Sequence, residues 1–474
     1  MKMNYAYFSF TRVIAVLALA AGIFVFRPGG LFFLNDDFIH LYLTSKGQWL
    51  QQNSFRPVCD LSMWLDYQLW ALNATGFHLT NVLIHFACSI LVYRFSFLLL
   101  GRYHQWAVAG SNAMLIAAIF FLYAFHSETV FWVIGRSASL GTAWFLLSLI
   151  FYLQRNESAK GFTFSVLFFA LGLLTYESVW ITPFVFAVFS YLDVKQRQSP
   201  IGKEWKYLLL TAGVMAVYLV VRFLAISQLV GPYEGTRFFN LDIGGLAANM
   251  LKLVLRGFSR QSGSLYLLLA AFVTSVAALV SFLLTRKKQF AFAVILLWLT
   301  GLIPYLSLGI DTFGSEGERY LYLPSIFFCI IIGLGIVNAR QWYKYAITII
   351  FFVVHVLLLM NARNDYETAS EATYNTVSEL KETTAAQQLY FLCLPGENNG
   401  ALIFRDGLPE AVKLYAPRAG KVHILSRCGG NFSFTGVTVE DPLSLQRTPA
   451  ADVVFDYSRS SLLVSYLPPG TISE

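Results

Sequence analysis

Residues 264–285 read SLYLLLAAFVTSVAALVSFLLT, a continuous apolar run that contains no charged side chain. A helix needs about 20 mostly apolar residues to cross the hydrocarbon core of a lipid bilayer. The run meets this requirement, and we therefore expect it to cross a membrane as one helix.

The same criterion finds further apolar segments on both sides of this run. By residue number they are 9–27, 79–99, 107–125, 137–154, 161–176, 178–193, 207–226, 289–309, 320–338 and 343–361. The chain is thus expected to be an all-α polytopic membrane protein with about eleven transmembrane helices. Two of the segments meet at Tyr176 and Glu177, so the count can differ by one at that point.

The overall composition agrees with this class of protein. The hydrophobic fraction is 57%, 13% of the residues are charged, and the mean hydropathy is +0.58. Soluble domains carry about a quarter charged residues. The net charge of +7 is spread among short loops, which is typical of a membrane face and not of a nucleic-acid site. Five cysteines form no CxxC pair, so a zinc or thioredoxin-like site is not indicated.

The distribution of basic residues predicts the orientation of the chain. Every second short connection is basic, as Arg102, Arg155, Lys203, Lys287 and Lys344 illustrate. Basic loops stay in the cytoplasm, so the opposite loops and the C-terminus should be extracytoplasmic. We therefore expect an integral protein of the cytoplasmic (plasma or inner) membrane. No small-residue cleavage site follows the first span, which indicates an uncleaved anchor.

The composition changes near residue 362 to mixed polar sequence with short alternating runs. These runs are Leu389–Leu394, Lys421–Leu425 and Val453–Tyr457. We therefore expect a transmembrane domain at 1–361 and a small extracytoplasmic β or α/β domain at 362–474. Cys393 and Cys428 both fall in the second domain, either as a disulfide or as two free thiols.

The first outer loop, residues 28–78, carries two adjacent carboxylates, Asp36 and Asp37. Two like charges at the bilayer edge should raise the pKa of one of them. The raised pKa would suit a general base that takes a proton from an acceptor hydroxyl near neutral pH. The alternative is a helix cap or an interfacial charge pair, and spacing alone does not separate the two interpretations.

The same loop and the start of the next span hold several candidate ligands for a phosphate or a metal, namely His40, Arg56, His78 and His85. Their spacing matches no standard metal motif, so no metal ligand is assigned, although a divalent metal is compatible with the residue set. No other cofactor is indicated. An interfacial hydrogen-bonding role for each histidine is the alternative.

Further ionisable residues lie beside the ends of other spans. They are His126, Glu128 and Arg136 near the third span, Glu177 near the sixth, and Glu318, Arg319 and Tyr322 near the tenth. Such residues are costly in a membrane and usually mark a functional cavity. The alternative is internal pairing that braces the helices, Glu318 with Arg319 or Glu128 with Arg136. For Glu177 alone we favour the structural role.

The segment 246–258 has apolar residues at helical spacing with Lys252 and Arg256 between them. We expect an amphipathic helix on the outer leaflet that holds an anionic lipid headgroup. No Walker or GxGxxG loop occurs, so a nucleotide-linked donor has no obvious binding loop. A lipid-linked phosphosugar fits both observations.

Three motifs follow one another in the first two-thirds of the chain. They are Phe55-Arg-Pro-Val-Cys-Asp-Leu with Leu72-Asn-Ala-Thr-Gly-Phe-His-Leu-Thr-Asn-Val-Leu-Ile-His85, then His126-Ser-Glu-Thr-Val with Gly135-Arg136, then Glu318-Arg-Tyr-Leu-Tyr-Leu-Pro-Ser325. Together they resemble the GT-C glycosyltransferases, most closely the transmembrane and tetratricopeptide-repeat (TMTC) O-mannosyltransferases. The tetratricopeptide repeats are absent from this chain.

The resemblance implies an inverting transfer of a hexose or mannose from a polyprenyl-phosphate donor to a hydroxyl of a protein or an envelope glycan. It implies a catalytic base in the acidic pair, Asp36 with Asp37 close behind. The implied donor-binding residues are Arg319, Arg136, Arg56, Tyr322 and Arg256. The residues we expect around the acceptor pocket are His40, His78, His126, Glu128 and Glu318.

Two alternatives from other functional classes remain. One is a transporter or flippase of lipid-linked glycans, although transporters usually carry ionisable groups near the bilayer midplane. The other is an inactive glycan-binding scaffold, which the presence of both Asp36 and Asp37 disfavours.

Overall fold

The computed structural model describes most of the chain. The described residues are 2–50, 54–104, 109–156, 159–196, 199–227, 243–259, 264–308, 310, 314–383, 388–428, 437–440, 451–458 and 461–472.

Helices dominate the first 382 residues. They are α1 (Lys2–Val25), α2 (Asp37–Ser45), α3 (Pro57–Trp70), α4 (Ala74–Tyr103), α5 (Ala109–Phe121), α6 (Ser127–Phe131), α7 (Arg136–Leu153), α8 (Ala159–Leu173), α9 (Thr182–Lys195), α10 (Ile201–Ile226), α11 (Ile243–Arg256), α12 (Leu265–Leu283), α13 (Lys288–Leu302), α14 (Ser325–Asn338) and α15 (Gln341–Glu382). Short 3₁₀ turns lie at Ala124–His126, Glu177–Ile181, Ile303–Tyr305 and Glu318–Leu321.

Each predicted apolar segment corresponds to a helix in the described part of the chain, and the expected fold class is confirmed. Seven of these helices are long and apolar enough to cross a membrane. An eighth span results if the bent pair α5 and α6, whose axes differ by 59°, counts as one. The remaining segments form the shorter apolar helices Phe10–Val25, Lys160–Leu173 and Ser325–Asn338.

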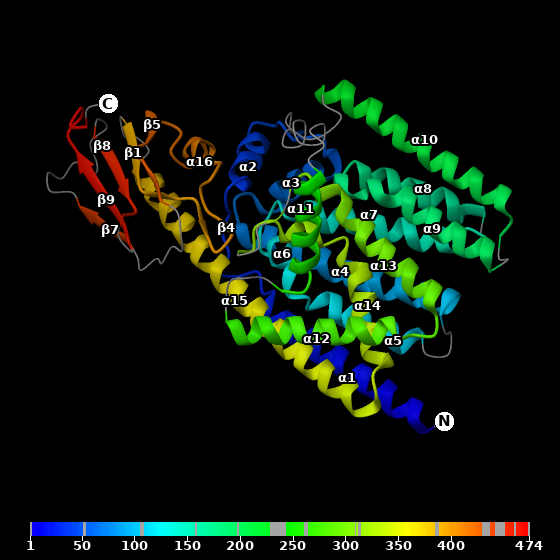
Figure 1. The fold of residues 1–474 in the computed structure, drawn as a ribbon. Helices are drawn as coiled ribbons and strands as arrows, with labels where there is room; N and C mark the ends of the chain where they lie inside the picture. The colour runs from blue at the N-terminus through cyan, green and yellow to red at the C-terminus, as the bar shows by residue number, and fades with distance from the viewer. Residues whose placement is uncertain are drawn as a thin grey trace.

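Helices α1 and α15 run side by side along one edge of the molecule (Figure 1). Arg363 of α15 joins them, because its guanidinium donates to the carbonyls of Val25 at 2.7 Å and Arg27 at 2.6 Å. The last carbonyls of a helix have no partner within the helix, and a cation stabilises that end of its dipole. Arg363 therefore caps the end of α1 from the neighbouring helix.

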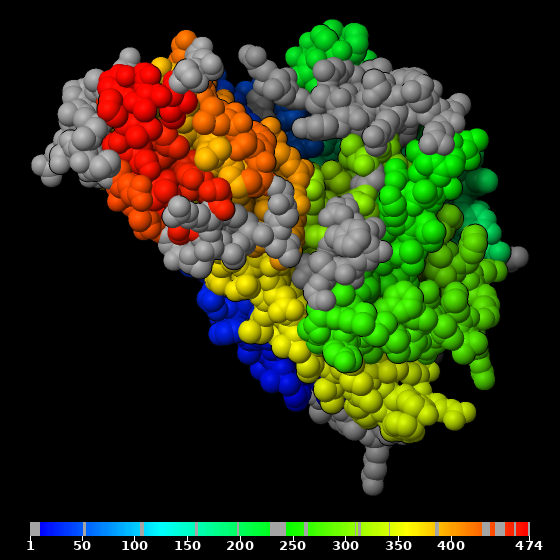
Figure 2. All heavy atoms as spheres, turned by 60° about the vertical axis from the view of Figure 1, so that its left-hand side comes forward, coloured from blue at the N-terminus to red at the C-terminus, as the bar shows by residue number. Residues whose placement is uncertain are grey.

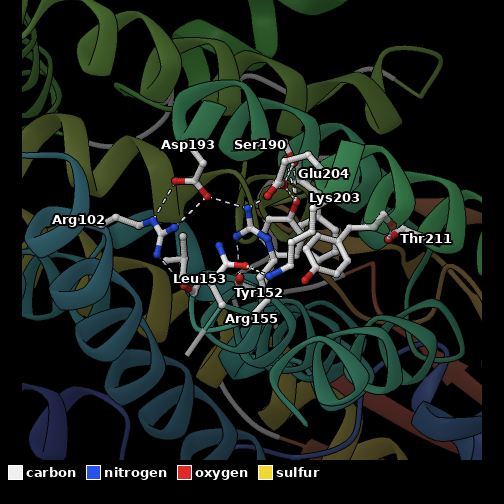
Figure 3. Close-up of polar contacts among 12 residues, drawn as sticks. Arg102, Tyr152, Leu153, Arg155, Ser190, Asp193, Lys203, Glu204 and Thr211 are labelled. Carbon is white, nitrogen blue, oxygen red and sulfur yellow. Dashed lines mark hydrogen bonds and ion pairs between the residues drawn. The ribbon is translucent and has the colours of Figure 1, made fainter. Parts of the chain in front are cut away.

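A buried ionic network joins α4, α9 and α10 at the ends that carry basic loops (Figure 3). Arg102 donates two hydrogen bonds to Asp193, at 2.9 and 3.0 Å. Arg155 donates to Asp193 at 2.7 Å and to Glu204 at 2.8 Å. Buried charges are tolerated when they are paired in this way, so the network fastens these helices together.

Helix α15 connects the helical bundle to the C-terminal part. Its 42 residues span about 63 Å at 1.5 Å per residue, roughly twice the hydrocarbon thickness. The helix continues without a break through residue 361. The two chain ends accordingly lie at opposite ends of the molecule (Figure 1).

The C-terminal part is a small β-rich unit, as expected. Its elements are β1 (Gln388–Leu392), β2 (Leu394–Pro395), β3 (Glu397–Asn398), β4 (Ala401–Leu402), α16 (Leu408–Tyr415), β5 (Lys421–Ile424), β6 (Arg427–Cys428), β7 (Val437–Glu440), β8 (Asp452–Asp456) and β9 (Leu462–Leu467). The main sheet has the order β5-β1-β8-β9-β7, with β8 antiparallel to β9 and the other pairs parallel. The three predicted alternating runs are thus the neighbouring strands β5, β1 and β8.

Cys393 and Cys428 form a disulfide in this unit. Helix α16 packs against α2, the helix that begins at Asp37. The described C-terminal residues, orange and red in Figure 2, lie directly against the helical part. The β-rich unit is therefore docked on the first outer loop.

Candidate active site

The two adjacent carboxylates of the first outer loop have different surroundings. Asp37, the first residue of α2, is fully buried. Its Oδ2 accepts the backbone N–H of Leu34 at 2.9 Å, and its Oδ1 accepts that of Ile134 at 3.0 Å. Burial raises the pKa of Asp37 to about 8. Both oxygens are engaged by backbone, so Asp37 ties the outer loop to the segment between α6 and α7.

Asp36 is half-buried, and its side chain does not cap α2. The amide of Asn35 donates to Asp36 Oδ1 at 3.0 Å. Burial raises the pKa of Asp36, and the neighbouring charge of Asp406 raises it further. The guanidiniums of Arg319, Arg56 and Arg405 act in the opposite direction, and the net pKa is above the ordinary value. Asp36 is therefore a half-buried carboxylate that is electrostatically coupled to three arginines.

Arg319 lies in the 3₁₀ turn Glu318–Leu321 and is held by Glu128 of α6. Its backbone N–H donates to Glu128 Oε2 at 2.8 Å, and its guanidinium binds Oε1 of the same carboxylate. The guanidinium carbon lies 5.2 Å from the ring centroid of Trp132 and 4.8 Å from that of Tyr320. The side chain remains 23% exposed, so part of its charge stays available.

Arg56 occupies a similar setting beside Glu177. Its Nε and Nη2 lie 3.0 and 2.9 Å from Glu177 Oε2, and its side chain is 30% exposed. The guanidinium carbon lies 5.0 Å from the ring centroid of Tyr176. Glu177 also accepts a hydrogen bond from the buried Arg222 of α10 at 3.2 Å. Glu177 therefore holds two arginines, in keeping with the structural role favoured for it.

The bracing pairs considered from the sequence are wrong in their partners. Glu318 does not pair with Arg319; it binds Arg256, while Glu128 takes Arg319. Arg136 pairs with Asp66 at 2.5 Å. Glu318 and Arg319 are neighbours in one 3₁₀ turn and point to different sides of it. Each therefore pairs with a residue that is far away in the sequence.

Two of the predicted donor-binding arginines are fully buried. Arg136 donates to Asp66 and, at 3.0 Å, to the carbonyl of Phe77. Arg256 binds the carboxylate of Glu318 and, at 3.0 Å, the carbonyl of Gly314. In α11, Lys252 is exposed as expected for an amphipathic helix, but Arg256 turns inward. Arg256 is thus paired with Glu318 inside the bundle, and its expected role in binding a lipid headgroup stays a prediction.

The remaining predicted donor-binding and pocket residues are buried, and Tyr322, His126 and His78 make internal hydrogen bonds. Tyr322 Oη lies 2.7 Å from His85 Nδ1, and His126 Nε2 lies 2.8 Å from Ser325 Oγ. His78 Nε2 lies 3.3 Å from the carbonyl of Phe32. His40 Nδ1 lies 3.8 Å from Asp60, and burial lowers the pKa of His40 to about 3. Their roles around an acceptor stay predictions.

Within the described ranges, no group of three or more His, Cys, Asp or Glu side chains could hold a metal ion. The sequence also left several site residues unnoticed, namely Asn35, Arg222, Arg405 and Asp406. Arg405 and Asp406 lie in the C-terminal unit, so nothing in the local pattern connects them with the first outer loop.

No family model matches the sequence. A protein O-mannosyl-transferase TMTC2 from Mus musculus is 34% identical over 128 residues, which are 27% of this chain and 14% of that protein. A protein O-mannosyl-transferase Tmtc2 from Drosophila melanogaster is 31% identical over 169 residues, 33% of this chain and 17% of the fly protein. The matched region is thus less than a fifth of either relative.

The structure is similar to the crystal structure of ArnT from Cupriavidus metallidurans in the apo state, with a TM-score of 0.52. The alignment covers 94% of this chain and 93% of that chain at 12% sequence identity, which shows a shared fold. The protein accordingly has the GT-C fold, and its similarity to the TMTC O-mannosyltransferases is confirmed over about a quarter of its length.

Proposed function

We propose that the protein is an inverting glycosyltransferase that moves a sugar from a polyprenyl-phosphate donor to an acceptor hydroxyl at the extracytoplasmic face. One feature carries the proposal: the half-buried carboxylate of Asp36 is electrostatically coupled to Arg319 and Arg56, whose side chains are 23% and 30% exposed. The proposed base for the acceptor hydroxyl, Asp36, and the proposed cations for the phosphate leaving group, Arg319 and Arg56, therefore belong to the same site.

The proposed reaction is a single displacement at the anomeric carbon. Asp36 removes the proton of the acceptor hydroxyl, whose oxygen forms a bond to C1 of the sugar as the bond from C1 to the phosphate oxygen breaks. Polyprenyl phosphate leaves with that electron pair, and the proton remains on Asp36 until solvent takes it. Arg319 and Arg56 stabilise the charge that develops on the phosphate.

The structure supports a division of labour among the predicted residues. Arg319 and Arg56 are 23% and 30% exposed, whereas the side chain of Arg136 has no exposed surface. We therefore assign phosphate contact to Arg319 and Arg56. Arg136, Arg256 and Tyr322 support the site from within the bundle. Asp37 acts as a structural cap, which leaves Asp36 as the base.

The side of the membrane is supported by two independent features. Basic residues gather in alternate loops, which favours a cytoplasmic position for those loops. The β-rich unit contains the Cys393–Cys428 disulfide, and disulfides persist in oxidising compartments. Both features favour an extracytoplasmic position for the site and the C-terminus, in a plasma or inner membrane. The names of the relatives support a mannosyl donor and a protein hydroxyl as acceptor.

The proposal is tested with the full chain in lipid nanodiscs. Polyprenyl-phosphate mannose and glucose, each labelled in the sugar, are offered with serine- and threonine-rich peptides or with oligosaccharides. We expect label to move to one acceptor class with inversion at C1, and Asp36→Asn to abolish the transfer. Transfer that proceeds equally well in Asp36→Asn and Asp37→Asn contradicts the mechanism. Transfer from a nucleotide sugar alone contradicts the donor class.

A further inference from the structure

The C-terminal unit reaches the first outer loop through the segment 397–407. The backbone N–H of Asn35 donates to the carbonyl of Ile403 at 2.9 Å. The backbone N–H of Asp406 in turn donates to Asn35 Oδ1 at 2.7 Å. A Cβ on Gly407 would lie 2.2 Å from the carbonyl oxygen of Asn35, so only glycine permits this approach. Asn35 is thus held on both its backbone and its side chain.

The same segment also binds the loop that leads to Arg319. The backbone N–H of Ser315 donates to the carbonyl of Asn399 at 2.9 Å. Arg405 donates to both carboxylate oxygens of Glu316, at 2.6 and 2.9 Å. Arg405 also binds Glu397 within its own segment. A bidentate pair of this kind fixes orientation as well as distance.

An apolar contact supports these polar links. The rings of Phe38 and Phe404 are stacked, with centroids 5.7 Å apart and planes at 20°, and both side chains are fully buried. Phe38 also meets the ring of Tyr415 of α16 edge-on, at 6.5 Å. The docking of the C-terminal unit on α2 therefore has a packed core, which resists sliding of one part past the other.

We propose that segment 397–407 is a clamp that sets the position of Asp36 relative to Arg319, with Asn35 and Arg405 as its positioning residues. The inference rests on the proposed function, because it concerns the same two site residues. Residues 403–407 of the clamp hold Asn35, the residue before Asp36. Arg405 also holds Glu316, and Asn399 holds Ser315, in the loop that leads to Arg319.

Asn35 links the clamp to the base directly. Its Nδ2 donates to the Asp36 carboxylate at 3.0 Å while its Oδ1 accepts from the clamp at 2.7 Å. Its backbone has φ of 47°, a left-handed conformation that is uncommon for residues other than glycine and asparagine. The amide side chain therefore transmits the position of the clamp to Asp36.

The kinetic test uses Asn35→Gly and Arg405→Ala in the full chain. Glycine accepts the left-handed backbone, so Asn35→Gly removes the two side-chain hydrogen bonds with little strain. We expect each variant to lower kcat about 10- to 100-fold, since a displacement of the base by about 1 Å has an effect of this size. Donor affinity should stay within about twofold of the parent. Arg405→Lys should recover part of the loss. Arg418→Ala, at an exposed arginine of the same unit, should match the parent.

A second readout does not depend on sugar transfer. Carbodiimide labels protonated carboxyls, and peptide mass spectrometry follows labelling of Asp36 as a function of pH. The charged groups that face Asp36 are Asp37, Asp406, Arg319, Arg56 and Arg405. Removing the Arg405 cation should move the labelling midpoint to higher pH, and Arg405→Lys should move it less. Asn35→Gly should change the labelling rate, because its amide shields Oδ1.

The outcomes separate the clamp from the proposed function. If the parent transfers no sugar but Asn35→Gly changes the labelling rate of Asp36 and Arg405→Ala shifts the midpoint, the clamp stands and the function fails. If the parent is active while kcat and labelling are unchanged in both variants, the clamp is refuted and the function stands. A fall in donor affinity and in thermal stability with kcat unchanged would show a merely structural contact and would also refute the clamp.

Discussion

The carboxylate of Glu128 accepts two hydrogen bonds from Arg319, one from its backbone N–H at 2.8 Å and one from its guanidinium, although 191 residues separate the two. This pair joins α6, the second arm of the bent helix pair, to the turn that begins at Glu318. Glu128 orients the guanidinium, and the Arg319 side chain remains 23% exposed. That arrangement leads to the first prediction.

Arg319→Ala should weaken binding of the polyprenyl-phosphate donor about 10- to 100-fold, because a hydrogen bond to a charged group contributes about 1.5–3 kcal/mol. Arg319→Lys should recover only part of the affinity, because lysine keeps the charge but lacks the planar fork. Donor binding is measured by native mass spectrometry in nanodiscs. Arg27→Ala, which removes another outer arginine, is the matched control. Equal donor affinity in Arg319→Ala and the parent would refute the assignment.

Asp36 and Asp37 should respond differently to substitution. Asp36→Asn should keep the thermal stability of the parent and lose sugar transfer. Asp37→Ala should lower the free energy of unfolding by about 1–3 kcal/mol, because it leaves the backbone N–H groups of Leu34 and Ile134 without their carboxylate acceptors. Thermal unfolding in detergent and a transfer assay measure the two properties. A stable but inactive Asp37 variant beside an active Asp36→Asn would reverse the roles.

The pH dependence of kcat/KM should report Asp36. A general base works when it is deprotonated, so activity should rise with pH through the pKa of Asp36, which burial and then Asp406 raise. Asp406→Asn removes a negative charge that disfavours ionisation, so the acidic limb should move to lower pH. The backbone N–H that binds Asn35 is retained in this variant. A limb that stays in place or moves upward would contradict the prediction.

The Cys393–Cys428 disulfide should stabilise the β-rich unit. It closes a loop with a sequence separation of 35, and the loop-entropy model then gives about 3–4 kcal/mol. The double variant Cys393→Ser with Cys428→Ser should therefore unfold at a lower temperature. Alkylation after denaturation without reductant should modify only Cys59, Cys88 and Cys329. Modification of all five cysteines without reductant would show that the bond does not form in cells.

The buried network around Asp193 should matter for stability and not for donor binding. Asp193→Ala removes the carboxylate shared by the buried Arg155 and the partly buried Arg102, and breaking a buried pair costs about 3–5 kcal/mol. We expect a marked loss of thermal stability and of folded protein in membranes. The protein that does fold should bind the donor like the parent. Lys195→Ala, at an exposed position on the same helix, should have little effect.

Much of the helical part was predictable because membrane insertion is a local property. Each apolar run satisfies its backbone within its own helix, so length and composition suffice to find it. The alternating runs of the C-terminal unit were also visible in the sequence. Their burial was not, because β1 buries its three central residues and β5 buries none. The order of those strands and the docking of α16 on α2 depend on contacts between distant residues.

The site itself was predictable only in part. Asp36, Arg319 and Arg56 stood out because charges beside membrane spans are costly. The ion-pair partners of the arginines did not stand out in the sequence. The pairs expected between residues close in sequence were wrong, because a guanidinium pairs with whichever carboxylate the packing brings near. Arg405 and Asp406 carried no signal, since exposed charges in a polar segment are ordinary.

The amino-acid sequence by itself determined that this chain is a many-span membrane protein with a β-rich end and polar residues gathered at one face. Hydropathy and residue spacing are local, and they act before any tertiary contact forms. Only the tertiary structure decided that Asp37 is sealed by two backbone amides while Asp36 stays open, and that the C-terminal unit holds Asn35. These outcomes depend on burial and on partners far away in sequence, which only the folded chain brings together.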